Sequence, residues 1–425
     1  MRRALVTSLG LLACAATGCD RHPEDPIFAY GRALHRDGTP RAGETLTLER
    51  LDDDLYTPLA TATTEASGDF TLEMLSGDAV REVDFFRTRN QLRLALPLEA
   101  DGSGTFLSFS MQDDVELPTL KPWDAHPVVG SSDQGPTVTF PPAPPAPPVP
   151  ETADTLELLG EDGSAIPLLP TVPEPLLWVT SGGELLWRQQ GMASPWTPSP
   201  YVLEDFAAPQ VRLRAASMGE WLFSPLGGES SSVYFRQEWR TGAEPLPAGT
   251  LRPLSRGATC EPSLADACPW TDGLLTPVDF WKEETDPRHH SVVITLPQPG
   301  VPQRAVVRGL YYLQGRGGRD WLVLEGSVDG EQWQSLARVL LRDMSPLEQS
   351  LRDATFGVYS EPTGGESPFG DGPLRLGVQE PVFQDVPLSG TAPVRFVRLS
   401  VESLIYDGTS PPAEFYTLSE VSIFE

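Results

Sequence analysis

Apolar and polar residues alternate along most of this chain, and turn-forming residues interrupt the alternation about every eight to twelve positions. A period of two residues places successive side chains on opposite faces of a strand, so the pattern predicts short strands with one buried face. The alternation runs from Ile27 to Leu117, with clear turn signals at Asp37-Gly38 and Ser67-Gly68-Asp69. Between Pro118 and Ser255, tryptophans and apolar residues recur without helical spacing. We therefore predict an all-β fold built from tandem β-sandwiches.

The N-terminal residues depart from this alternation and have the form of an export signal. Two arginines precede an apolar run from Ala4 to Ala16, which is shorter than the ~20 residues that a membrane-spanning helix needs. Small residues then lead to Cys19, and this arrangement resembles the lipobox of bacterial lipoproteins. The resemblance implies that residues 1–18 are removed, that Cys19 is acylated and that residues 19–26 form a tether. A competing lipobox ends at Cys14, and an ordinary signal peptide without lipid is the other alternative.

Three regions follow the tether, at residues 27–117, 118–255 and 256–425, and each is long enough to bury its own core. The middle region contains a proline-rich segment, 141–150, which predicts a polyproline II conformation. This segment could serve as a stiff linker, as a ligand for aromatic grooves or as a rigid loop inside one sandwich.

The first region contains Gly31-Arg32-Ala33, Asp37-Gly38-Thr39-Pro40 and the run from Thr63 to Phe70, in this order. These features resemble the carboxypeptidase regulatory-like β-sandwich, whose members usually act as spacers or adhesive modules. The resemblance implies a stalk. The middle region is interpreted as a second sandwich similar to a fibronectin type III domain.

The third region carries four ordered motifs: Asp272-Gly273 followed by Thr276, Ser327 to Trp333, Phe396 to Leu399, and Ser419 to Val421. Their order resembles the discoidin, or coagulation factor 5/8 type C, domain, which is a galactose-binding-like jelly roll. The resemblance implies that the chain ends in a discoidin-like jelly roll that binds a carbohydrate or another cell-surface ligand through loops at one end. The candidate ligand-binding residues in the segments between strands are Trp281, Arg288, His289, Arg316 and Arg319.

The same resemblance implies a calcium ion held by Asp272, Thr276 and Glu420. Calcium takes about six to eight oxygen ligands, and two carboxylates, a hydroxyl and loop carbonyls could supply most of them. In a second interpretation, Asp272 braces its own turn by accepting hydrogen bonds from backbone N–H groups.

The number of cysteines that remain after the signal is removed agrees with export of the chain. Acylation at Cys19 would remove Cys14 with the signal, which leaves Cys260 and Cys268 as the remaining pair. Thiols in an exported chain oxidise, so we predict a disulfide between these two residues. A two-cysteine metal site is the alternative, but no histidine lies at zinc-finger spacing from them.

Composition and charge narrow the class of function. The 44 prolines and 38 glycines suit turns between strands, and the net charge of −28 argues against nucleic acid as a partner. All five histidines lie in sequence that predicts loops, and no catalytic constellation is evident.

We expect a non-enzymatic lipoprotein of the cell envelope, at the outer membrane or cell surface rather than the inner membrane. Its partners would be the membrane, through the lipid, and a glycan or surface protein. The alternatives are a glycan-active envelope enzyme that uses the discoidin module for targeting, and a structural subunit that docks another protein.

Overall fold

The structure is a computed structural model that describes residues 22–425 with interruptions. The residues it leaves undescribed within this range are 53–54, 84–85, 90–91, 110, 112–113, 134, 143–153, 156, 160–164, 168–174, 191–192, 224–230, 263–266, 281–289, 313–318, 344–380 and 405–411. The predicted signal, Cys19 and most of the proline-rich segment therefore lie outside the described residues.

Strands dominate the described part of the chain, and the all-β prediction is confirmed. The helices α2 (Ser76–Ala79) and α3 (Pro200–Leu203) have four residues each. Within the described ranges, no helix has the length and apolar character needed to cross a membrane. The chain forms two compact units: unit 1 contains Met1–Pro127, Phe140–Leu176 and Arg212–Ala243, and unit 2 contains Val128–Thr139, Leu177–Val211 and Glu244–Glu425.

Unit 1 is built around a β-sandwich formed by the N-terminal strands. One sheet has the order β4-β1-β9, and β3, β2, β7 and β8 are neighbours in the other. Apolar residues at alternate positions, such as Leu46 and Leu48 or Leu92 and Leu94, are fully buried between the sheets. The strands of this unit are β1 (Pro26–Arg32), β2 (Thr45–Asp52), β3 (Leu55–Thr63), β4 (Asp69–Leu75), β5 (Val80–Val83), β6 (Phe86–Arg89), β7 (Leu92–Ala95), β8 (Gly104–Phe109), β9 (Val115–Glu116), β12 (Asp154–Thr155), β13 (Glu157–Leu159), β14 (Ala165–Pro167), β17 (Gln210–Phe223) and β18 (Ser231–Arg240).

The predicted boundary between residues 117 and 118 needs correction. Strand β18 pairs antiparallel with β8, from Phe235 opposite Phe109 to Arg240 opposite Gly104, and β17 pairs with β18. These strands complete the hydrogen bonds along the β8 edge of the first sandwich, so 27–117 and 118–255 do not form separate sandwiches. The remainder of the predicted middle region, residues 128–139, 177–211 and 244–255, belongs to unit 2.

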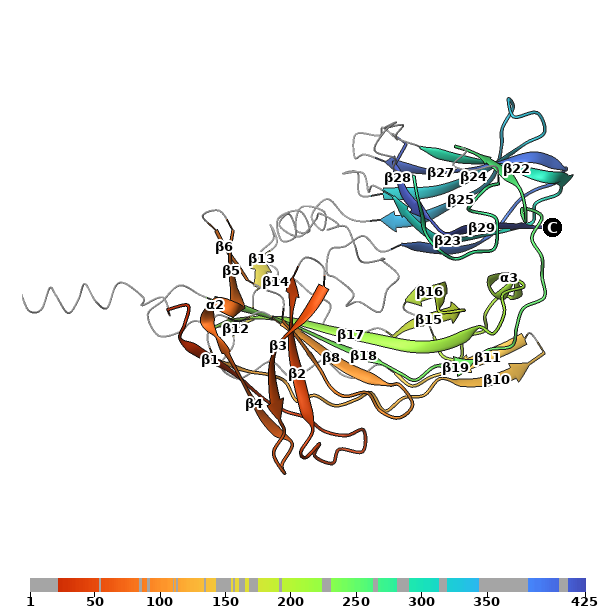
Figure 1. Ribbon diagram of the computed structural model, residues 1–425. Coiled ribbons are helices and arrows are strands. Elements are labelled where there is room, and N and C mark those ends of the chain that lie inside the picture. The colour runs from red at the N-terminus through yellow and green to blue at the C-terminus, as the bar shows by residue number, and fades with distance from the viewer. Residues whose placement is uncertain are drawn as a thin grey trace, which may run out of the picture. The chain divides into compact units, whose positions relative to one another are not determined.

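Unit 2 contains the C-terminal sandwich. Its first sheet has the order β20-β22-β27-β24-β25, and its second has the order β21-β28-β23-β26, with β29 also paired to β23 (Figure 1). The strands of this unit are β10 (Val128–Ser132), β11 (Gly135–Thr139), β15 (Pro175–Ser181), β16 (Glu184–Gln190), β19 (Glu244–Pro245), β20 (Thr259–Glu261), β21 (Val278–Asp279), β22 (Ser291–Gly300), β23 (Arg304–Tyr312), β24 (Arg319–Ser327), β25 (Gln334–Asp343), β26 (Val382–Pro387), β27 (Val394–Leu404), β28 (Phe415–Leu418) and β29 (Glu420–Phe424).

The core of this sandwich follows the alternation seen in the sequence. Val397, Leu399 and Val401 of β27 are fully buried, whereas the residues between them face outward. Aromatic residues close the space between the sheets near the start of the domain, where Trp270 stacks on Phe280 with ring centroids 4.3 Å apart. Burial of this apolar surface is the main stabilising contribution to the sandwich.

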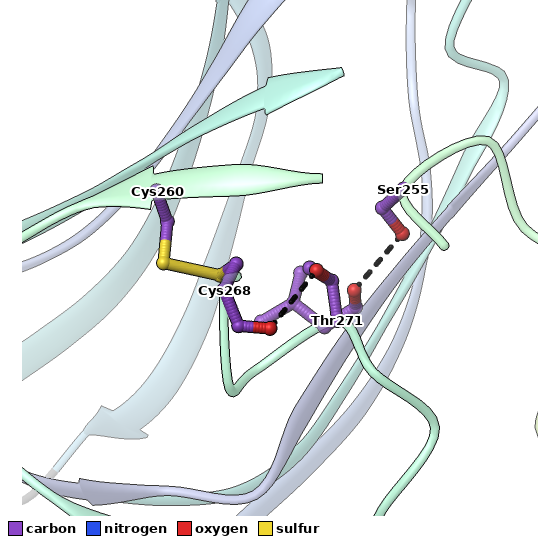
Figure 2. Close-up of a disulfide and its surroundings, with 5 residues drawn as sticks. Ser255, Cys260, Cys268 and Thr271 are labelled. Carbon is purple, nitrogen blue, oxygen red and sulfur yellow. Dashed lines mark hydrogen bonds between the residues drawn. A yellow bond between two sulfur atoms is a disulfide. The ribbon is translucent and has the colours of Figure 1, made fainter. Parts of the chain in front are cut away.

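The predicted disulfide is confirmed. Cys260 on β20 and Cys268 are bonded, with their Cα atoms 5.0 Å apart, and both side chains are buried (Figure 2). The hydroxyl of Thr271 donates to the carbonyl of Cys268, so the bonded segment continues directly into the turn at Asp272.

Candidate ligand-binding site

The loop residues predicted to bind ligand are only partly described. Trp281, Arg288, His289 and Arg316 lie outside the described residues, and Arg319 is exposed at the start of β24. Arg319 is opposite Leu404, near the end of β27, and Asp343, at the end of β25. Arg319, the described member of this predicted set, therefore lies beside the ends of β25 and β27. Their role in binding stays a prediction.

A buried carboxylate fixes the strands at this end. Asp320 accepts hydrogen bonds from the Tyr312 hydroxyl (3.0 Å) and the Ser403 hydroxyl (2.6 Å). All three residues are almost fully buried, so these bonds satisfy polar groups that would otherwise be costly inside the core. The contacts join β23, β24 and β27.

The residues predicted to bind calcium have other partners in the structure. Asp272 is exposed and its Oδ1 accepts from the Leu274 N–H at 2.8 Å, which is the turn-bracing role. Glu420 is fully buried and accepts from the Gly273 N–H (3.2 Å) and from Arg256 (3.4 Å). Thr276 is exposed. Among the residues that the structure describes, no group of three or more His, Cys, Asp and Glu side chains could hold a metal ion, and the cation beside Glu420 is the Arg256 guanidinium. Calcium binding stays a prediction.

The turn at Gly273 requires glycine for two reasons. Its φ of +86° lies in the left-handed region, where a Cβ atom is strained. A Cβ there would also lie 1.8 Å from Nη1 of Arg256, so the guanidinium packs directly against the glycine backbone.

Arg256 belongs to a buried ion cluster, which we define as Glu204, Arg256, Arg308 and Glu420. Arg256 pairs with Glu204 as well as with Glu420, and Nη2 of Arg308 lies 3.1 Å from Oε2 of Glu204. The Ser422 hydroxyl accepts from Arg308 (2.8 Å) and donates to Glu204 (2.6 Å). Two arginines and two glutamates thus contact one another in unit 2.

Arg308 also binds the C-terminal end of helix α3. Its Nη2 donates to the backbone carbonyls of Tyr201 (3.2 Å) and Val202 (3.0 Å). A helix this short leaves its last carbonyls without intrahelical partners, and a cation is a favourable group at that end. Glu204 itself ends the helix with φ 48° and ψ −136°. The segment after β16 is therefore held against the outer face of β23 and β29.

Burial shifts the pKa values of two residues in the buried ion cluster, Arg308 and Glu420. Desolvation lowers the pKa of Arg308, against the opposing attraction of Glu204 and Glu420. Desolvation and then the nearby Glu204 charge raise the pKa of Glu420, Arg256 and Arg308 lower it, and the net result is a pKa of about 8. Both carboxylates are fully buried, so no substrate could reach this pair in the described conformation.

The outer face of the first sheet presents a different set of charged and aromatic side chains. Its inward-facing residues fill the core, and the alternate positions on β24, β25 and β27 face away from it. We define the binding face as the six outward side chains that pair with one another: Trp321, Glu325, Trp333, Arg338, Arg398 and Glu402.

These six residues form two groups of the same composition. In the first, Cζ of Arg338 lies 4.2 Å from the ring centroid of Trp321, and its Nε and Nη2 lie 3.3 Å from Oε2 of Glu402. Guanidinium stacking on indole is a favourable cation–π contact, and the carboxylate fixes the orientation of the guanidinium.

In the second group, Cζ of Arg398 lies 4.3 Å from the ring centroid of Trp333, and its Nε lies 2.8 Å from Oε2 of Glu325. Trp333 reaches this position through the loop between β24 and β25. In that loop, Asp329 accepts from the backbone N–H groups of Gln332 and Glu331, which lowers the pKa of Asp329. Gly330 adopts φ +81° there.

The sequence motifs include Trp333 and Arg398 but gave them no ligand-binding role, and Trp321 and Arg338 were overlooked. One signal was available: aromatic and charged residues occupy the outward positions of strands whose inward positions are aliphatic. The pairing of those positions depends on which strands are neighbours, and the sequence pattern does not contain that information.

Comparisons with known proteins give only distant similarities. No protein-family profile and no curated protein matches the chain. One similar solved structure is described as a pectin binding carbohydrate binding module, at 10% identity and a TM-score of 0.18 over 37% of this chain and 78% of that one. Another is described as a glycoside hydrolase, at 9% identity and a TM-score of 0.20 over 86% of this chain and 66% of that one. At these TM-scores the similarities carry no argument about function.

The buried ion cluster predicts unequal effects of two neighbouring truncations. Glu204→Ala leaves Arg308 buried without its carboxylate partner, and we expect a loss of about 3–5 kcal/mol in the unfolding free energy of unit 2. Asp205→Ala removes a carboxylate that is 44% exposed and pairs with Arg256, and we expect a loss of about 0–1 kcal/mol. Urea denaturation of both variants checks this, and equal midpoints would contradict it.

Glu420 predicts a pH-dependent stability. Its folded pKa of about 8 lies above the ordinary value of 4.5, so folding favours the protonated form. The resulting stabilisation is complete below pH 4.5, decreases as the pH rises and is lost above about pH 8. Glu420→Gln cannot ionise, so the melting temperature of the wild type minus that of this variant should fall across this range. A difference that stays constant with pH would show that Glu420 does not titrate there.

Proposed function

We propose that this protein is a non-enzymatic, membrane-anchored lipoprotein whose C-terminal sandwich binds a carbohydrate at the binding face. The observation that carries the proposal is the pair of tryptophan–arginine–glutamate groups on one sheet face, where both tryptophans are partly exposed. Indole surfaces provide the apolar contact that sugar rings favour, and the guanidinium and carboxylate groups provide donors and acceptors for their hydroxyl groups. The end-loop residues predicted from the sequence would extend this surface.

The non-enzymatic part of the proposal is supported by the burial of the neighbouring carboxylates Glu204 and Glu420. A glycosidase needs two carboxyl groups that flank a bound substrate. Glu204 and Glu420 are both fully buried in unit 2 and form ion pairs with arginines, and burial raises the pKa of Glu420. This environment suits a structural role better than catalysis.

Carbohydrate binding is tested by removing the aromatic surfaces. A glycan array probed with the purified full-length chain identifies the sugar, and affinity electrophoresis measures its binding. Trp321→Ala and Trp333→Ala should each weaken binding by about tenfold, because central aromatic contacts typically contribute more than 1 kcal/mol. Leu274→Ala is the matched control, because Leu274 is 63% exposed but lies outside the binding face. Unchanged binding in both tryptophan variants would exclude this face as the site.

The membrane anchor is tested at Cys19. Mass spectrometry of protein extracted from membranes should find an acylated N-terminal peptide that begins at Cys19, and Cys19→Ala should move the protein to the soluble fraction. Several acyl chains are expected to anchor stably, since each buried methylene contributes about 0.8 kcal/mol. An unmodified N-terminus at another residue would refute the anchor, while carbohydrate binding would remain a separate question.

A further inference from the structure

The two groups of the binding face are separated along the strands. In the register of β24 with β27, Trp321 is opposite Glu402 and Glu325 is opposite Arg398. The strand from residue 321 to residue 325 spans about 13 Å at roughly 3.3 Å per residue. This separation exceeds the size of one sugar ring, so a single sugar could not contact both groups.

On β24 and β27, small side chains lie between the two groups, whereas on β25 Arg338 of the first group is opposite Val323. Val323 of β24 is opposite Ser400 of β27, and only 7% of Val323 is exposed. Neither residue is long enough to project far above the sheet. A chain-like ligand could therefore follow the strand direction from one group to the other.

The charges of the binding face are balanced within each group. Arg338 is paired with Glu402, and Arg398 is paired with Glu325. An anionic ligand would have to displace a carboxylate or lie beside it, and the net charge of −28 on the chain adds repulsion. A guanidinium has five N–H donors and a carboxylate only acceptors, so each pair offers both functions to a sugar hydroxyl, which itself donates and accepts.

We infer that the binding face takes an extended, uncharged oligosaccharide that lies along the strands and contacts both tryptophan–arginine groups. The inference rests on the proposed function and specifies its ligand class. Each group would contact a different part of the sugar chain, and the balanced arginine–glutamate pairs would select against uronates and sulfated glycans.

Charge selection is tested with matched polysaccharides that share a backbone, such as hydroxyethyl and carboxymethyl cellulose, or methyl-esterified and de-esterified polygalacturonan. In affinity electrophoresis, the full-length chain should be retarded by at least one neutral polymer and not by its charged form. The double variant Glu325→Gln/Glu402→Gln leaves both arginines uncompensated, so it should gain retardation by the charged form. Glu331→Gln, an exposed carboxylate in the β24–β25 loop, is the control and should behave like the wild type.

The outcomes separate this inference from the proposed function. Wild-type retardation by a charged polymer that is lost in Trp321→Ala would overturn the uncharged ligand class and keep carbohydrate binding. Retardation by no polymer of either kind would overturn both.

Contact with both groups is tested by ligand length. Oligosaccharides of increasing length are prepared from the polymer that retards the protein. Their affinity should rise about tenfold or more once the ligand spans both groups. Trp333→Ala should abolish this rise but change the affinity for the disaccharide by no more than about twofold. A monosaccharide that binds as tightly as the longest ligand would overturn the extended binding mode.

Discussion

The arrangement of unit 2 depends on the buried ion pair between Arg308 and Glu204. Arg308 projects from the outer face of the second sheet, and its full burial there is tolerated only because Glu204, Ser422 and two carbonyls of α3 surround it. The pair therefore fixes the 177–211 segment to the C-terminal sandwich. One outer face of the sandwich is covered by this segment, and the other carries the binding face.

Arginine–glutamate pairs occur on both outer faces of the sandwich, but they contribute differently to stability on each. In the buried ion cluster, desolvation makes each partner obligatory, because an unpaired charge cannot be hydrated there. On the binding face, the arginine side chains are 32% and 46% exposed, so water already solvates them and their pairing with glutamate contributes little to stability. The first arrangement is suited to holding the fold, and the second leaves donors and acceptors available to a ligand.

Local patterns predicted much of the fold but not its long-range pairings. Alternation between neighbouring residues predicts the all-β class and the inward positions Val397 and Leu399. The Cys260–Cys268 bond could be predicted because few cysteines remain to be paired. The pairing of β8 with β18 could not be predicted this way, because an edge strand and its partner share no sequence signature. The contact between Arg308 and Glu204 was missed for a similar reason: one lies in an apolar strand and the other follows a four-residue helix, so neither position indicates a charged partner.

The pairing of β8 with β18 also sets the order in which the chain can fold. A chain synthesised from its N-terminus presents β8 long before Arg240, the last residue of β18, has been made. During that interval the apolar sandwich of unit 1 has an open edge, with backbone N–H and C=O groups free to pair with another chain. A truncation before residue 231 would leave this edge of β8 without its partner strand.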